Sequence, residues 1–173
     1  MTSAPDTRET AASTTNREPE RTSPDPRVSA RYSRQRRSGT APELLLRQEL
    51  HQRGRRFRVQ MRIVGLPRRR VDLAFTRWRF VVFVDGCFWH GCPVHGVLPG
   101  TNRDWWTWKL ARNHDRDVDT DERLRSLGWE VLRVWEHLSH GDAADEVEAC
   151  LIRLGAPASS GRARRGPDSP ASS

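Results

Sequence analysis

A chain of 173 residues accommodates one domain of ordinary size, and its length favours one domain over two. Hydrophobic residues make up 35% and charged residues 30%, but seven Trp and five Phe exclude a wholly disordered protein. The formal net charge of +8 favours a polyanionic partner, because basic side chains gain affinity by displacing counterions from phosphates. The stretch from 47 to 79 concentrates this charge, with eleven Arg, two acids and a local balance of +9.

Both ends of the chain have the composition of tails. Residues 1–30 and 156–173 are rich in Ser, Thr, Pro and Arg, so we expect disorder there and a folded domain at 31–155. The start of the chain lacks a signal-peptide pattern, three Cys cannot complete a disulfide framework, and no apolar run approaches the roughly 18 residues of a membrane span. These features predict a cytoplasmic, nucleoid-associated protein without a membrane partner, and we expect a monomer.

The first predicted element is a short helix. Thr40 and Glu43 have the spacing of a capping box, with Pro42 in the first turn and Gly54 as the stop signal. Three extended runs follow, at 57–63, 70–75 and 80–85. The last run is nearly all apolar, which favours a central strand.

The second half alternates helix, strand and helix after an irregular stretch rich in Gly and Pro. A long polar helix is predicted over 104–127, an alternating strand over 129–135 and a final helix over 142–154. The order α-β-β-β-α-β-α indicates an α/β fold, that is, a mixed sheet with flanking helices.

Two carboxylates lie on or at the end of neighbouring predicted strands. Asp72 interrupts a mostly apolar strand, so it needs either an Arg partner or a metal ion. Asp85 precedes Gly86, which is equally typical of a turn and of a Mg²⁺ ligand at a strand end. Glu43 is fully explained locally by capping, and only context from elsewhere promotes it to an active-site acid.

Two thiols and two imidazoles have the types and number of a tetrahedral zinc site: Cys87, Cys92, His95 and His137. Such a site would fix the Gly/Pro-rich loop, which by itself buries little surface. The alternative is free cysteines with scattered loop histidines. His140 is a possible substitute for His137 as the fourth ligand.

Aromatic residues gather after the third strand and at the start of the long helix. Trp105 and Trp108 suit a buried helix face, but Trp106 points elsewhere, so some of these rings are predicted to meet a ligand. Beside a basic region, exposed rings stack on bases or wedge between them. His90 is a candidate for proton transfer, although a lone histidine is more often a packed or surface residue.

The long helix places Asn113, Arg116 and Asp117 on one face. Taken alone, this group is typical of a solvated polar face.

Five blocks in order carry a resemblance: TAPELLLRQELHQRGRRFRVQ, LPRRRVDLAF, VVFVDGCFWHGC, TNRDWWTWKLARNHDRD and LGWEVLRVWEH. Over roughly residues 31–140 the chain resembles the Vsr endonucleases of very short patch repair, which have the PD-(D/E)xK nuclease fold. The α-β-β-β-α-β order of that fold agrees with the order derived from periodicity.

The resemblance implies a role for each matching residue. Asp72 and the backbone carbonyl of Val84 would bind catalytic Mg²⁺. His90 would be the catalytic histidine, Asp117 would orient it, and Glu43 would be the helix acid near the site. The aromatics expected to intercalate beside the mismatch are Phe88, Trp89 and Trp106.

The sequence departs from the better-known members at several positions. Val71 stands where they have Pro before the metal-binding Asp, and Asp85 stands where they have His, so Asp85 is a candidate for a further Mg²⁺ ligand here. His137 replaces a Cys of the WEC motif, and GCPVH replaces a run of His with a following Cys. Four N/S ligands remain, which favours a rearranged structural Zn²⁺ site. No catalytic Lys is present, as in this branch of the fold.

The first functional hypothesis is therefore a Mg²⁺-dependent DNA endonuclease that nicks one strand beside a T:G mismatch, in repair after deamination of 5-methylcytosine. Its partners would be mismatched double-stranded DNA and other repair proteins. The alternatives are a restriction-type nuclease of the same fold and a non-catalytic, zinc-stabilised DNA-binding module. The clustered carboxylates argue against the module, because they repel phosphates unless a cation intervenes.

Overall fold

The computed structural model describes residues 17–22 and 39–159 and confirms the predicted order of elements. The helices are α2 (Ala41–Gln52), α3 (Arg103–Ser126) and α4 (His140–Arg153). The strands are β1 (Arg58–Ile63), β2 (Leu66–Phe75), β3 (Phe80–Asp85) and β4 (Glu130–Trp135), and a 3₁₀ turn, η1 (Thr76–Trp78), joins β2 to β3. Most bounds lie within two residues of the prediction.

The strands form one mixed sheet in the order β1-β2-β3-β4. The pairs β1–β2 and β2–β3 are antiparallel, whereas β3 and β4 are parallel and are joined through α3. The parallel register pairs Phe80 with Glu130 and ends with Asp85 beside Trp135. The carboxyl ends of β3 and β4 therefore meet at one edge, where α/β folds display functional groups.

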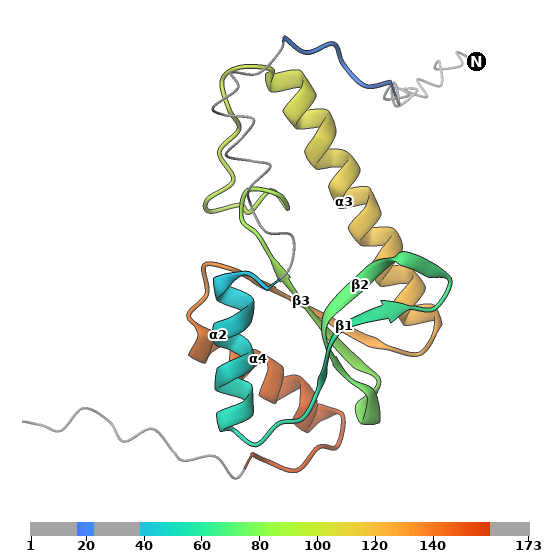
Figure 1. The fold of residues 1–173 in the computed structure, drawn as a ribbon, viewed down its shortest axis with the longest axis vertical. Coiled ribbons are helices and arrows are strands. Elements are labelled where there is room, and N and C mark those ends of the chain that lie inside the picture. Colours follow the sequence, from blue (N-terminus) through green and yellow to red (C-terminus); the bar gives the residue numbers. More distant parts are fainter. Residues whose placement is uncertain (1–16, 23–38, 160–173) are drawn as a thin grey trace, which may run out of the picture.

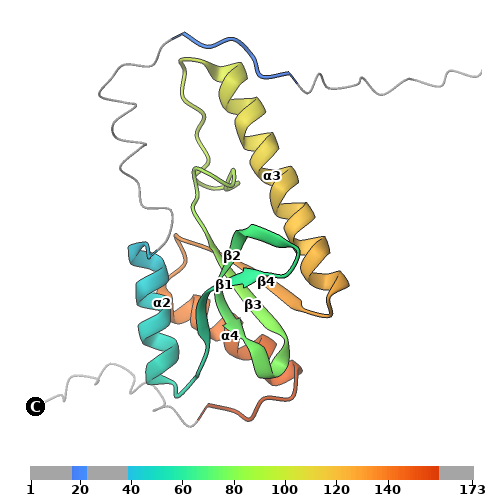
Figure 2. The same ribbon diagram turned by 45° about the vertical axis from the view of Figure 1, so that its right-hand side comes forward.

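Helices cover both faces of the sheet (Figures 1 and 2). Because strand side chains alternate between faces, Val82 and Val134 pack toward α2 and α4, whereas Val81 and Phe83 pack toward the C-terminal end of α3. Leu50 and Leu151 are fully buried in the first of these two cores. Two separate apolar cores thus hold β3 in place on both faces of the sheet. This fixes the position of Asp85 at the end of β3.

Only the last part of α3 belongs to a core. Leu124 packs in the cluster with Phe83, whereas the first half of α3 extends past the sheet next to the loop that follows β3 (Figures 1 and 2). The side chains of this first half are thus available to a site outside the two cores.

Two local predictions differ from the structure. Strand β2 starts at Leu66 rather than near residue 70, because Ile63 pairs with Leu66 across a tight turn in which Gly65 has a φ of 80°. The capping box is wrong in detail: Thr40 makes no side-chain capping bond, and its hydroxyl instead donates to Glu43 at 3.2 Å.

Parts of the predicted tails make contacts with the domain. The backbone N–H of Thr22 donates to the side chain of Asn102, and the Trp105 indole donates to Glu18 at 2.7 Å. At the other end Ala156 is buried, and the carbonyl of Pro157 accepts from Arg55. The rest of the predicted tails lies outside the described residues. Within the described residues, no helix combines the length and apolar character that crossing a membrane requires.

Candidate active site and metal centre

Asp72 lies on β2 with its carboxylate turned toward β3. The backbone N–H of Val84 donates to one carboxylate oxygen at 2.9 Å, and the Gln60 side chain donates to the other at 3.0 Å. In the described part of the chain, its hydrogen bonds thus come from amides and not from a guanidinium. The pKa of Asp72 is raised to about 6, mainly by burial and partly by the nearby charge of Glu43, against the bond from Val84.

Glu43 is buried at the start of α2 and is close enough to influence Asp72. Its carboxylate accepts from the backbone N–H of Gly39 at 2.9 Å and from Arg47 at 2.8 Å. Glu43 therefore holds the start of α2 and also adds negative charge to the site.

His90 is bound by the long helix. Its Nδ1 lies 2.6 Å from an oxygen of Asp117 on α3 and 3.8 Å from Asp85. Burial lowers the pKa of His90, but the hydrogen bond to Asp117 and the charge of Asp85 together raise it above its ordinary value. Because Nδ1–H donates to Asp117, Nε2 is left as the nitrogen that can exchange a proton with a ligand.

Asp85 is buried at the end of β3 and is paired with Arg133 on β4. One guanidinium nitrogen, Nη1, donates to both Asp85 oxygens, at 2.8 and 3.0 Å. Burial raises the pKa of Asp85, although the charges of His90 and Arg133 oppose the rise. Sequence reasoning missed Arg133; the signal available was a charged residue inside an alternating strand.

The aromatic residues pack on one another outside both apolar cores. Phe88 lies 5.0 Å from Trp106 and 5.2 Å from Trp89, measured between ring centroids, and Trp105 lies 4.8 Å from Trp106. Asn113 on α3 donates to the backbone carbonyl of Trp89 at 3.1 Å and so ties the loop to the helix. None of these rings belongs to either core of the described residues.

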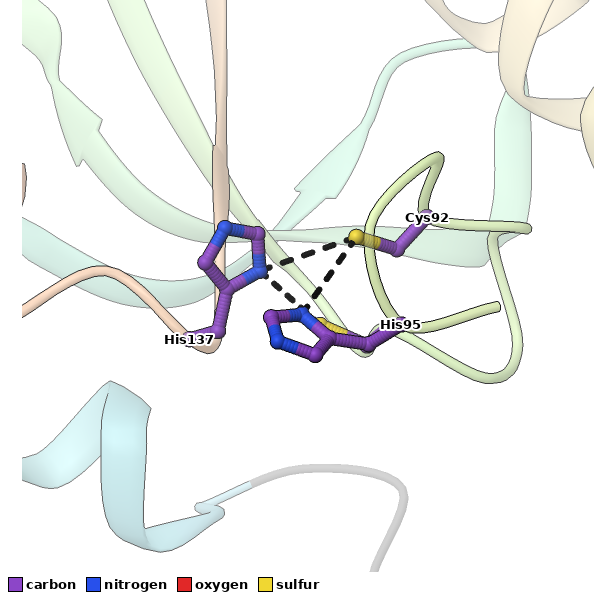
Figure 3. A group of neighbouring side chains, drawn as sticks. Cys92, His95 and His137 are labelled. Atoms are coloured by element: carbon purple, nitrogen blue, oxygen red, sulfur yellow. Dashed lines mark hydrogen bonds between the residues drawn. The ribbon is translucent and has the colours of Figure 1, made fainter. Parts of the chain in front are cut away.

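The predicted ligand set forms a compact cluster beside the site: Cys87, Cys92, His95 and His137. Their potential ligand atoms all lie within 4.8 Å of one another. His137 Nδ1 is 3.1 Å from the Cys87 sulfur and 3.6 Å from the Cys92 sulfur, and His95 Nδ1 is 3.9 Å from each (Figure 3). Ordinary Zn–S and Zn–N bond lengths in a tetrahedron place S and N about 3.6 Å apart.

The cluster can therefore hold a metal ion without large rearrangement. Burial raises the pKa of the Cys87 thiol to about 11, so an ion that binds there must displace its proton. The side chain of Glu136 accepts from the backbone N–H of Cys87 at 2.6 Å and fixes the start of the loop. His140 begins α4 and is outside the cluster.

The structure thus brings most of the predicted residues together at the carboxyl ends of β3 and β4. Asp85, His90, Asp117 and Arg133 form one connected group, and Asp72 is joined to the same end of β3 through the backbone N–H of Val84. Arg116, predicted on the same helix face, is exposed, and its carbonyl accepts from Arg69 and Thr120 instead.

Comparisons with known proteins agree with this geometry. Residues 23–95 match the family model described as DNA mismatch endonuclease Vsr. The chain is 45% identical over 121 residues to the type II nicking enzyme V.NaeI of Lentzea aerocolonigenes, which covers 69% of this chain and 73% of the relative. The chain belongs to the Vsr family of DNA endonucleases.

Two further relatives support the same assignment. DNA mismatch endonuclease Vsr of Escherichia coli K12 is 39% identical over 117 residues, covering 66% of this chain and 72% of the relative. The type II nicking enzyme V.NmeAIP of Neisseria meningitidis is 37% identical over 99 residues, with 56% and 68% covered. The protein is therefore a DNA endonuclease, a hydrolase, and the non-catalytic binding module proposed as an alternative is set aside.

Proposed function

We propose that this Vsr-family endonuclease nicks one strand of duplex DNA beside a T:G mismatch in a Mg²⁺-dependent reaction, as in very short patch repair. The observation that carries the proposal is the juxtaposition of a buried carboxylate on β2 with a histidine held by α3. Asp72 and the backbone carbonyl of Val84 would supply oxygen ligands on one side, and the Asp117–His90 pair would supply a proton-transfer group on the other.

The residues at Asp72 fit a divalent cation. A buried carboxylate without a guanidinium partner is costly when ionised, and a hard cation that prefers oxygen ligands removes this cost. Mg²⁺ bound by Asp72 and the Val84 carbonyl would neutralise the scissile phosphate and activate water. Asp85 is a candidate further ligand, and both of its oxygens also accept hydrogen bonds from Arg133.

The proton-transfer role falls to His90. Asp117 accepts from Nδ1–H, which orients the ring and stabilises its protonated form. Nε2 then gives a proton to, or takes one from, the oxygen at the cleavage point. Because the pKa of His90 is raised, against the effect of burial, by Asp117 and Asp85, the protonated ring that a general acid needs is favoured.

The aromatic cluster supports mismatch selectivity. Phe88, Trp89 and Trp106 lie outside the cores on the part of the molecule that carries the site. Apolar wedges unstack base pairs at a cost of a few kcal/mol, and this cost is lowest at a mismatch. The basic residues on β1 and β2 complement this by contacting phosphates without reading sequence.

We also propose that the cysteine–histidine cluster holds structural Zn²⁺. The cluster joins the loop after β3 to His137, two residues after the end of β4. This loop carries Phe88, Trp89 and His90 between the candidate ligands Cys87 and Cys92. A metal ion there would position both the wedge and the catalytic histidine.

The deciding experiment is a strand-nicking assay on labelled duplexes that carry T:G or C:G at one position. We expect a T:G-selective nick with Mg²⁺ that disappears with EDTA and with Asp72→Asn. Equal cutting of both duplexes would replace mismatch recognition by the restriction-type activity. Undiminished cutting by Asp72→Asn would remove Asp72 from the metal site.

A further inference from the structure

Arg133 is surrounded by three carboxylates that come from two elements. Nη1 donates to both oxygens of Asp85, and Nε and Nη2 donate to Asp121 on α3 at 3.0 to 3.3 Å. Nη2 also lies 3.6 Å from the outer oxygen of Asp117. The guanidinium lies over the Phe83 ring, 4.6 Å from its centroid, so its plane is fixed between sheet and helix.

His90 has two carboxylates within reach. Its Nδ1 is 2.6 Å from Asp117 and 3.8 Å from Asp85, and a small rotation of the ring would exchange one partner for the other. In the first arrangement α3 orients the ring, whereas in the second the end of β3 would orient it. Asp85 differs from Asp117 in that both of its oxygens already accept hydrogen bonds from Arg133.

We propose that Arg133 is a positioning residue that selects Asp117 as the partner of His90 by occupying Asp85. It does not touch DNA or the reacting atoms in this role; it acts through the two carboxylates. Its absence would leave Asp85 free to compete with Asp117 for one imidazole, and the ring would no longer be held in a single orientation.

The chemistry of the side chain explains why an arginine is needed. A planar guanidinium reaches Asp85 with one end and Asp121 with the other, and it stays charged in a protein interior. An ammonium group is a single point charge and cannot bridge the two carboxylates in a fixed plane. The replacement of His by Asp85 relative to better-known family members thus comes with a cation that neutralises it.

This inference rests on the proposed role of His90, so His90→Ala is measured beside the other variants on the duplex that the wild-type protein nicks fastest. Arg133→Met is expected to lower kcat on the order of 100-fold with little change in KM, as for a misplaced catalytic group. Adding Asp85→Asn to Arg133→Met is expected to recover most of the loss, because the competing charge is then gone. Nitrogen chemical shifts of His90 should show one Nδ1–H tautomer in wild type and a mixture in Arg133→Met.

The matched control is Arg125→Met. Arg125 also pairs with Asp121, at 3.5 Å, but it is 56% exposed, and we expect it to leave kcat unchanged. If Arg133→Met does not fold, as judged by thermal unfolding, Arg133→Gln takes its place, because it keeps a polar side chain of similar length but removes the charge and the guanidinium that bind both oxygens of Asp85.

Either of two results would overturn the inference. The first is wild-type kcat in Arg133→Met, or in Arg133→Gln where that variant stands in, and the second is no recovery on adding Asp85→Asn. Full activity in His90→Ala would instead refute the proposed role of His90, on which the inference depends.

Discussion

Replacing Asp72 by Asn should stabilise the protein while it destroys activity. The pKa of Asp72 rises from 3.8 to about 6 in the folded state. At neutral pH the group is therefore ionised in an environment that destabilises its charged form. Each pKa unit corresponds to about 1.4 kcal/mol, so the shift costs the folded state at most about 3 kcal/mol. Asn keeps the volume of the side chain and an oxygen that can accept the N–H of Val84.

The sign of the pH dependence follows from the same shift. A raised carboxyl pKa destabilises the fold above about pH 6, and this cost fades as pH falls toward 3.8, where Asp72 is protonated in both the folded and unfolded states. The free energy of unfolding of Asp72→Asn should therefore exceed that of wild type at pH 7 to 8 and match it near pH 3.5. Urea unfolding in EDTA across this range measures the difference.

Asp119→Asn is the matched control, because its carboxylate is 62% exposed and pairs with Arg69 at the surface. We expect its stability to change by no more than about 0.5 kcal/mol at any pH. Added Mg²⁺ should stabilise wild type and leave Asp72→Asn unaffected, since binding to the folded state alone raises stability by mass action. If Asp72→Asn is no more stable than wild type at pH 8, the assignment of a costly buried charge to Asp72 is refuted.

Three further predictions follow from other parts of the molecule. Metal analysis of the purified protein should find one zinc ion per chain, and Cys92→Ser should lose it and unfold at a lower temperature; a wild-type protein without metal would refute the zinc site. Trp106→Ala should slow nicking of the T:G duplex more than nicking of the C:G duplex, because it removes part of the wedge. An unchanged ratio of the two rates would exclude Trp106 from mismatch recognition. Arg55→Met should destabilise the protein by roughly 3 to 5 kcal/mol in urea unfolding, because it leaves the buried carboxylate of Glu148 unpaired, and Arg55→Met with Glu148→Leu should recover most of this loss.

The sequence was sufficient for the elements whose signals are local. Strands β3 and β4 contribute side chains to cores on both faces of the sheet. This packing requires apolar residues at regular positions, and the resulting patterns predicted both strands. The beginning of β2 was predicted too late, because the pairing of Ile63 with Leu66 depends on the hairpin and not on the polar, Pro-containing segment itself. The prediction of a Thr40 capping bond was wrong because the Thr40 hydroxyl donates to the Glu43 carboxylate instead. Gly39 and Arg47 hold this carboxylate in place, and the spacing alone does not reveal these contacts.

The site was predictable where each residue type carries its own chemistry, and incompletely where the role depends on a partner. Cysteine and histidine spacing predicted a cluster that the fold brings together, with His137 in it and His140 outside. Asp85 was ambiguous because a carboxylate before glycine suits a turn, a cation or an arginine equally well. Its partner Arg133 lies 48 residues later on a parallel strand, and only the register of β3 with β4 brings the two together.

The same register explains how one edge of the sheet can carry both binding and chemistry. The parallel pairing places the end of β3 beside the end of β4. The loop after β3 carries the aromatic residues and His90, and the cysteine–histidine cluster joins this loop to the segment after β4. Helix α3 then supplies Asp117 to the histidine and Asn113 to the wedge loop from a single rigid element. A shift of α3 would therefore move the aromatic loop and His90 together, and this coupling would join the proposed mismatch recognition to the proposed proton transfer.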